Sequence, residues 1–173
     1  YIMVNFNYDI NNIKFIRSVT EGVPGNRVFS IELFTEDINI KIIIEKEQLI
    51  AVCEYIIRNL YDKNIPELPE EFDFDPDFDE EYRSNDLTIE ILAQSEQFQL
   101  YFRNQEDEGI SNQILIKITY EQALNFAKSS INLSSKGRPV CKLCHRPMNQ
   151  NDISSENPLV CINCPRKNGH HKN

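Results

Sequence analysis

The sequence has no tryptophan, three histidines and five glycines among its 173 residues, and it has no long apolar run. Its richest apolar stretch, Ile42–Ile44, is followed at once by Glu45 and Lys46, well short of the roughly 18 apolar residues of a membrane-spanning helix. Residues 1–12 lack the basic start, apolar centre and small-residue cleavage site of a secretory signal. We therefore expect a cytoplasmic protein that does not contact the membrane.

Short motifs of common catalytic sites are also missing. The chain has no phosphate-binding loop, no GxSxG nucleophile elbow, no HExxH metal motif and no glycine-rich dinucleotide turn. Its histidines, His145, His170 and His171, all lie near the C-terminus. A binding function is therefore expected ahead of a catalytic one.

Basic residues are scarce in most of the chain and concentrated at its end. Residues 1–135 carry 11 Lys or Arg against 25 Asp or Glu, whereas residues 136–173 carry 7 against 2. An acidic surface disfavours nonspecific contact with polyanions, and a basic one favours it. We predict an α+β domain over 1–135, with an acidic loop at 64–82, and a zinc-binding tail over 136–173.

Hydrophobic periodicity predicts strands and helices in the first part. Apolar and polar residues alternate in several short segments, as in half-buried strands. Over Glu45–Asp62 the period changes to 3.6 residues, which predicts an amphipathic helix with Cys53 in its buried stripe. A second helix is predicted to begin with a capping box formed by Thr119 and Gln122. The predicted strands are Phe15–Thr20, Arg27–Thr35, Ile38–Ile44, Leu87–Ala93, Gln97–Phe102 and Gln113–Ile118.

The two sets of predicted elements have the same order, three strands and then a helix. A weak sequence echo accompanies this order at an offset of 74, because Glu47 and Gln48 recur as Glu121 and Gln122. The apolar stripe of each helix must be buried against another element, such as a sheet. We therefore predict an α+β fold with an antiparallel sheet built from two βββα-like halves, both helices on one face, and a small C-terminal zinc ribbon or knuckle.

The acidic loop admits more than one interpretation. Its alternating carboxylates could bind a catalytic cation, but no glycine provides the sharp bend of a calcium loop, which favours a solvated loop. Its aromatic residues could dock a basic partner or pin the loop to its own domain, and pinning is favoured. The carboxylates are Asp73, Asp75, Asp77 and Asp79, and the aromatic residues are Phe72, Phe74, Phe78 and Tyr82.

Two CxxC pairs in the tail form the strongest motif. Cys141 and Cys144 are separated by sixteen residues from Cys161 and Cys164. Two such pairs complete the tetrahedral four-thiolate shell that zinc prefers, and clustered CxxC pairs are typical of metal sites rather than of disulfide scaffolds. Four thiolates leave no position for a catalytic water. We predict a structural zinc ion.

The residues around these cysteines resemble a known family. The string Cys141-x-x-Cys144-x-Arg146-Pro147, followed by Cys164-Pro165-Arg166-Lys167-Asn168-Gly169-His170, is similar to the C-terminal signature of an uncharacterised bacterial family, domain of unknown function 3090. Residues 22–29 are similar to its early glycine-proline turn. The resemblance implies an α+β body with a zinc-like tail and brings no established activity. In that pattern a His stands one residue from the last cysteine, so the third ligand is either Cys161 or a nearby His.

The expected function is that of a zinc-binding protein, a noncatalytic module that binds another protein or regulates it. The alternative is nucleic-acid binding through the basic rim of the metal site. Against it, no aromatic residue for base stacking occurs from Lys136 onward, and the same cations could simply offset the negative charge of a zinc tetrathiolate. A metal-dependent enzyme is the third and least favoured class. The candidate polyanion-binding residues are Arg138, Lys142, Arg146, Arg166 and Lys167.

Overall fold

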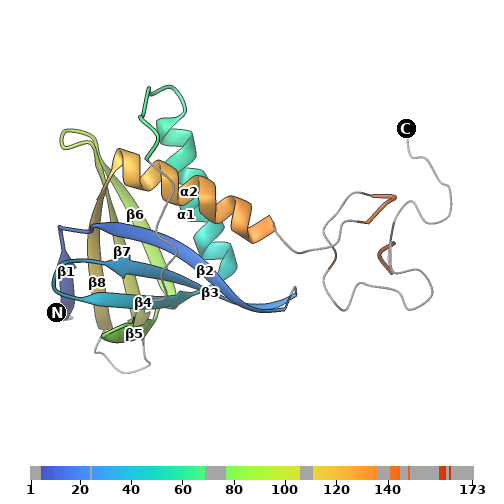
Figure 1. Cartoon of the computed structure of the whole chain (residues 1–173), viewed down its shortest axis with the longest axis horizontal. Helices are drawn as coiled ribbons and strands as arrows, with labels where there is room; N and C mark the ends of the chain where they lie inside the picture. The colour runs from blue at the N-terminus through green and yellow to red at the C-terminus, as the bar shows by residue number, and fades with distance from the viewer. Residues whose placement is uncertain are drawn as a thin grey trace. The chain divides into compact units, whose positions relative to one another are not determined.

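The structure, a computed structural model, consists of a body built on two β-sheets and a second unit that contains the tail cysteines (Figure 1). The body comprises Tyr1–Thr20 and Val28–Ser134, and the second unit comprises Glu21–Arg27 and Ser135–Asn173. The residues that the structure describes are 5–23, 25–68, 77–105, 111–135, 141–144, 148, 160–162 and 164.

Strands and helices follow each other in two similar series, four strands and a helix each time. Neither helix has the length and apolarity that a membrane-spanning helix needs. The elements are β1 (Asn5–Ile10), β2 (Phe15–Val23), β3 (Asn26–Phe34), β4 (Asn39–Ile44), α1 (Lys46–Leu60), β5 (Glu80–Arg83), β6 (Asp86–Leu92), β7 (Gln97–Gln105), β8 (Ser111–Thr119) and α2 (Tyr120–Ser135).

The strands form two four-stranded sheets, in the orders β1-β8-β7-β6 and β2-β3-β4-β5. Antiparallel pairing joins β6 to β7, β7 to β8 and β3 to β4, whereas β1 pairs with β8 and β5 with β4 in parallel. Each sheet therefore contains the last three strands of one series and the first strand of the other.

Two short connections join the edges of the sheets. Strand β1 continues into β2 through residues 11–14, and β5 continues into β6 through Ser84 and Asn85. Ser84 is buried, its N–H donates to the carbonyl of Ile43, and its hydroxyl donates to the carbonyl of Arg103. Ser84 therefore hydrogen-bonds to one strand of each sheet, which is how a chain that switches sheets keeps its buried polar groups satisfied.

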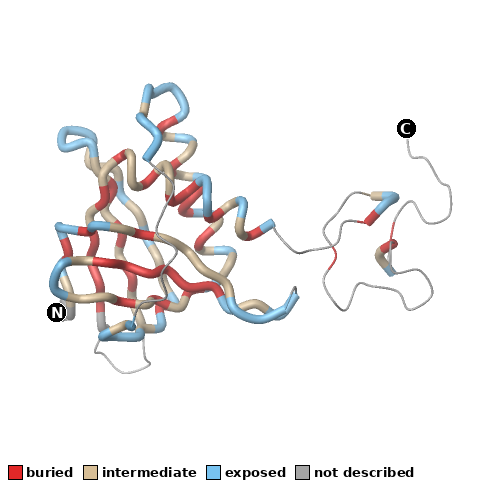
Figure 2. The backbone as a smooth tube through the Cα atoms, viewed as in Figure 1, coloured by how far each residue is buried: buried red, intermediate tan, exposed pale blue. Residues whose placement is uncertain are grey.

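The inner faces of both sheets and the apolar stripes of both helices share one core. In β4 buried and partly buried residues alternate, as the period of a strand requires. Helix α1 buries residues spaced three and four apart, including Cys53, which confirms the predicted place of that cysteine. Figure 2 shows these buried stretches along the facing strands and helices. The three largest fully buried side chains are Phe98, Phe102 and Phe126.

The start of α2 confirms the predicted capping box. The N–H of Thr119 donates to Oε1 of Gln122 at 3.0 Å, and the N–H of Gln122 donates to the hydroxyl of Thr119 at 3.2 Å. Helix α1 begins after Glu45, whose side chain makes no such bond. The two helix starts thus differ in sequence and in capping.

The sequence echo at an offset of 74 corresponds to a repeated structural arrangement. The amide nitrogen of Gln48 in α1 donates to the carbonyl of Asn85, in the β5–β6 connection, at 2.8 Å. The amide nitrogen of Gln122 in α2 donates to the carbonyl of Ile13, in the β1–β2 connection, at 2.7 Å. Each helix therefore donates a hydrogen bond to the connection that follows the first strand of the other series.

The predicted α+β class is confirmed, but the predicted single antiparallel sheet is corrected to two sheets that each contain one parallel pair. Strands β1 and β5 were not predicted from the sequence, and β5 overlaps the end of the predicted acidic loop. Each parallel pairing involves β1 or β5. Because these two strands were not predicted, the remaining strands could be arranged in one antiparallel sheet.

Candidate metal centre

Each CxxC pair forms a turn that aims its sulfur atoms inward. Residues 142–144 are in a turn conformation, and the N–H of Cys164 donates to the carbonyl of Cys161 at 3.2 Å. The two turns are linked because the N–H of Cys161 donates to the sulfur of Cys141 at 3.4 Å. Backbone donors of this kind stabilise a thiolate, which is the form that binds metal.

All four cysteine sulfurs lie within 4.8 Å of one another. The Sγ atoms of Cys141 and Cys164 are 3.7 Å apart, and so are those of Cys144 and Cys161. A disulfide would require about 2.05 Å, and none of the four cysteines forms one. In a tetrahedral shell with metal–sulfur bonds of about 2.3 Å, neighbouring sulfurs lie about 3.8 Å apart. The separation across the two turns therefore fits a four-thiolate metal site.

The cluster has a buried side and a partly exposed side. Cys141 and Cys164 are buried together with Met148 and Val160, whereas Cys144 and Cys161 are partly exposed. An apolar shell of this kind excludes water from the metal–sulfur bonds on one side.

The thiols influence each other's ionisation. Backbone N–H donors, first that of Cys144, lower the pKa of Cys141 to about 6. Burial, followed by the neighbouring thiols, raises the pKa of Cys161 to about 12. Four thiolates at this spacing repel one another, and a bound cation would stabilise all four together. The four thiol donors thus fit a thiophilic ion, and a tetrahedral ion would have no position left for water.

Among the candidate polyanion-binding residues, the described part of the chain includes Lys142, which is exposed in the first turn. The other four lie outside the described residues, as do the three histidines that were alternatives for the third ligand. At the position in question, Cys161 belongs to the sulfur cluster.

Two exposed apolar residues in the turns were missed by the sequence analysis. Leu143 is 38% exposed and Ile162 is 46% exposed, and each lies between the two cysteines of its pair. Their position between paired cysteines could have indicated this exposure, because a turn that directs both cysteines inward leaves little room to bury the residues between them.

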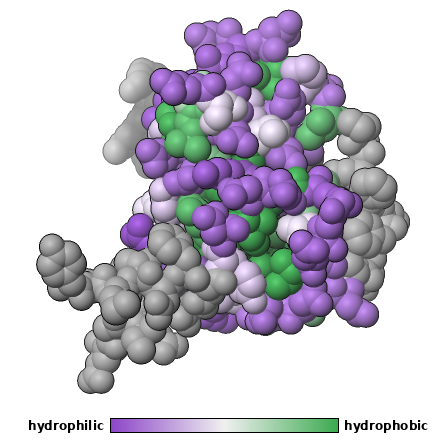
Figure 3. All heavy atoms as spheres, turned by 90° about the vertical axis from the view of Figure 1, so that its left-hand side faces the viewer, coloured by the Kyte–Doolittle hydropathy of each residue, from purple (hydrophilic) through white to green (hydrophobic). Residues whose placement is uncertain are grey.

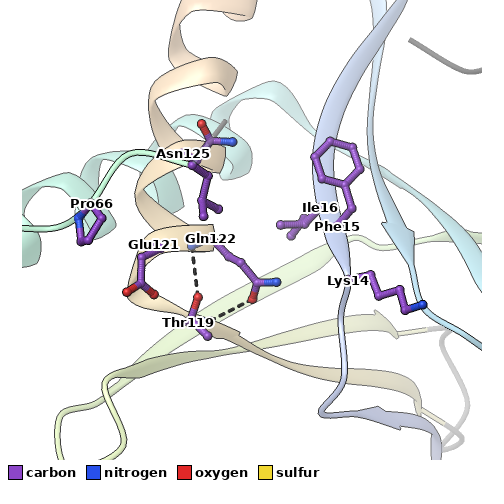
Figure 4. A pocket seen from close by; sticks show the side chains of 9 residues that line it. Lys14, Phe15, Ile16, Pro66, Thr119, Glu121, Gln122 and Asn125 are labelled. Atoms are coloured by element: carbon purple, nitrogen blue, oxygen red, sulfur yellow. Dashed lines mark hydrogen bonds between the residues drawn. The ribbon is translucent and has the colours of Figure 1, made fainter. Parts of the chain in front are cut away.

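The body contains a hollow of about 430 Å³ between the start of β2, the segment at Pro66 and the first turns of α2 (Figure 4). Three of its polar residues have structural partners. Thr119 and Gln122 bond to each other in the capping box, and the ammonium of Lys14 pairs with Glu36 at 3.0 Å. The lining residues include no histidine, cysteine or serine, and the carboxylate of Glu121 is the one acidic group among them.

The described part of the acidic loop is attached to the body. The carboxylate of Asp79 accepts the N–H of Asn39 at 2.8 Å, and the ring of Phe78 lies 5.7 Å from that of Phe34. These contacts agree with the pinning interpretation for Phe78 and give Asp79 a structural partner. Asp73, Asp75, Phe72 and Phe74 lie outside the described residues.

Glu32, the one strongly buried carboxylate among the residues that the structure describes, also has a partner. Its oxygen accepts a hydrogen bond from Nε of Arg17 at 2.6 Å, and its side chain is 7% exposed. The guanidinium of Arg17 lies 5.5 Å from the ring centre of Phe34. This cross-strand pair accounts for the charge in structural terms.

Comparison with known proteins places the chain in a family. Residues 8–153 match the family described as "protein of unknown function (DUF3090)", so the chain belongs to that family. The matched region includes Cys141 and Cys144 and ends before Cys161 and Cys164. Neither a curated protein nor a solved structure matches the chain.

Proposed function

We propose that this protein is a noncatalytic, cytoplasmic binding module in which a structural zinc ion organises the tail for contact with another protein. The observation that carries the proposal is the set of four sulfurs within 4.8 Å of one another. Such a shell has no open position for a substrate or a reactive water, so the ion would have a folding role. The tail has few residues with which to build a core, and metal binding would supply its stability.

The body supports the noncatalytic part of the proposal. Of the polar residues that line the hollow at α2, Thr119 and Gln122 are engaged in the capping box and Lys14 in the ion pair with Glu36. Of the two candidate carboxylates of the acidic loop that the structure describes, Asp77 and Asp79, that of Asp79 accepts a hydrogen bond from the N–H of Asn39. These contacts favour a scaffold over a metal-dependent enzyme.

The metal part is tested by elemental analysis of the purified full chain. About one zinc per chain is expected, and the double variant Cys141→Ser, Cys144→Ser should contain none. Cys53→Ala is the matched control, since it removes the buried cysteine that lies outside the cluster. A wild-type protein that holds a folded tail without metal would contradict the proposal.

The binding part is tested against the nucleic-acid alternative. Contact with phosphates predicts that affinity for RNA or DNA falls steeply with salt and is lost on charge reversal at Arg166 and Lys167. We expect no such salt-dependent binding in a fluorescence titration. Partners recovered from native lysate should instead be proteins, and they should disappear with the zinc-free double variant.

A further inference from the structure

The exposed apolar residues of the two cysteine turns form the basis of a more specific inference, which rests on the proposed function. Leu143 and Ile162 are among the few large apolar side chains that are more than a third exposed in the described part of the chain. The same unit buries Met148 to 1% and Val160 to 7% exposure. The unit thus has an apolar interior, and these two side chains are outside it. They are adjacent in sequence to the partly exposed Cys144 and Cys161, whose Sγ atoms lie 3.7 Å apart.

The metal site accounts for this exposure. When both cysteines of a CxxC turn point at one ion, the two residues between them lie on the outside of the turn. Four metal bonds would then hold Leu143 and Ile162 in place, so little conformational freedom remains to be lost when they bind. Preordered aliphatic side chains on a fixed turn suit an interface better than mobile ones do.

We infer that Leu143, Ile162 and the exposed Lys142 form a docking surface, here called the knuckle face, for a protein segment that combines acidic and apolar side chains. The aliphatic side chains of Leu143 and Ile162 suit apolar side chains of a protein. They do not suit the bases of a single-stranded nucleic acid, which stack on aromatic side chains. Lys142 and the excess of 7 basic over 2 acidic residues in 136–173 call for an acidic surround.

The rest of the surface offers less for such a segment. On the face of the body in Figure 3, hydrophobic side chains form small patches separated by hydrophilic ones. Residues 1–135 carry 25 acidic against 11 basic residues, and this charge repels an acidic segment. Val23 and Val28 are also more than a third exposed, but residues 21–28 carry one acidic and one basic residue, whereas the knuckle face belongs to a basic sequence.

The probe is a library of random twelve-residue peptides, selected against the zinc-loaded full chain. We expect enrichment of sequences with Asp or Glu beside Leu, Ile or Phe. The double variant Leu143→Ser, Ile162→Ser should weaken binding of a selected peptide by about tenfold or more, the loss typical of truncated interface anchors. Tyr61→Ser is the matched control, because Tyr61 is an exposed aromatic of the body, and it should bind as the wild type does.

Three outcomes would overturn the inference. They are no enrichment at all, enriched peptides that bind the double variant as well as the wild type, and retention of a random single-stranded DNA pool that depends on Leu143 and Ile162. Zinc content is measured for every variant. A zinc-free wild type would count against the proposed function, whereas a zinc-loaded wild type with no dependence on these residues would count against the knuckle face alone.

Discussion

The body and the cysteine unit differ in how many interactions hold them together. In the body, buried apolar residues from both helices and from β1–β4, β7 and β8 form one cluster, and each residue contributes a small share of the stability. In the cysteine unit, the described cluster contains the four cysteines with Met148 and Val160. Stability in the body is therefore distributed, and in the tail it depends on one centre. Loss of one side chain or ligand should therefore affect the stability of the two regions very differently.

Removal of the metal is the sharpest way to test this difference and has the largest expected effect. Binding of structural zinc is worth on the order of 10–16 kcal/mol in small modules, far more than any single contact in the body. Cys141→Ser with Cys144→Ser, or a chelator, should unfold the tail and leave the body folded. Limited proteolysis followed by mass spectrometry should show new cleavage confined to the second unit, Glu21–Arg27 and Ser135–Asn173.

The same centre should respond to pH. At neutral pH the thiol of Cys161, with its pKa raised to about 12, must lose a proton when metal binds, so affinity falls as pH falls. The expected change is about tenfold per pH unit for each proton released. Cleavage within the body, Tyr1–Thr20 and Val28–Ser134, after chelation would contradict the separation of the two regions.

The second test removes one large side chain from the body. Phe98 is fully buried, and its ring centre lies 5.4 Å from that of Tyr120 and 6.3 Å from that of Tyr55. Phe98→Ala should lower the free energy of unfolding by about 3–5 kcal/mol, because the cavity adds to the lost apolar burial. Urea denaturation gives this value, and zinc content should not change. Tyr61→Ser, on the surface, should shift stability by less than about 0.5 kcal/mol.

The strands that the sequence analysis found are those whose patterns are local. In β4 and β8, isoleucines at every second position mark the core face, and the capping box at Thr119 marks the start of α2. Strand β5 was not predicted, because its residues, Glu80–Arg83, are mostly charged and exposed. Its pairing with β4 comes from the tertiary arrangement, and no period in its own sequence indicates it.

Strand β1 could have been predicted, since Tyr8 and Ile10 alternate with polar residues and both pack against the core. Its parallel pairing with β8 could not, because that pairing joins residues about 105 positions apart. For the metal centre, the CxxC spacing identified all four sulfurs that the structure brings together. The exposure of Leu143 and Ile162 depends on how the turns fold, which the spacing alone does not determine.

The third test compares the two halves of the body through their equivalent hydrogen bonds. Gln122→Ala removes both the bond to Ile13 and the acceptor for the N–H of Thr119, whereas Gln48→Ala removes the bond to Asn85. We expect losses of about 1–2 kcal/mol for Gln122→Ala and about 1 kcal/mol for Gln48→Ala. Chemical denaturation of both variants measures the difference. Equal losses would mean that the capping box adds nothing measurable to the body.

The smallest expected effect concerns Cys53, the buried cysteine of the body. Burial raises the pKa of its thiol to about 12, above the ordinary value of 9.0, so the folded state holds this proton at pH values where the unfolded chain has lost it. The resulting stability is complete below about pH 9 and is lost as pH rises toward 12. Between pH 9 and 10 the free energy of unfolding should fall by up to about 1 kcal/mol more in the wild type than in Cys53→Ala. Urea denaturation at both pH values measures the two slopes. Since lysines and tyrosines titrate in both proteins, only the difference reports on Cys53, and identical slopes would show that the thiol is not shielded in the core.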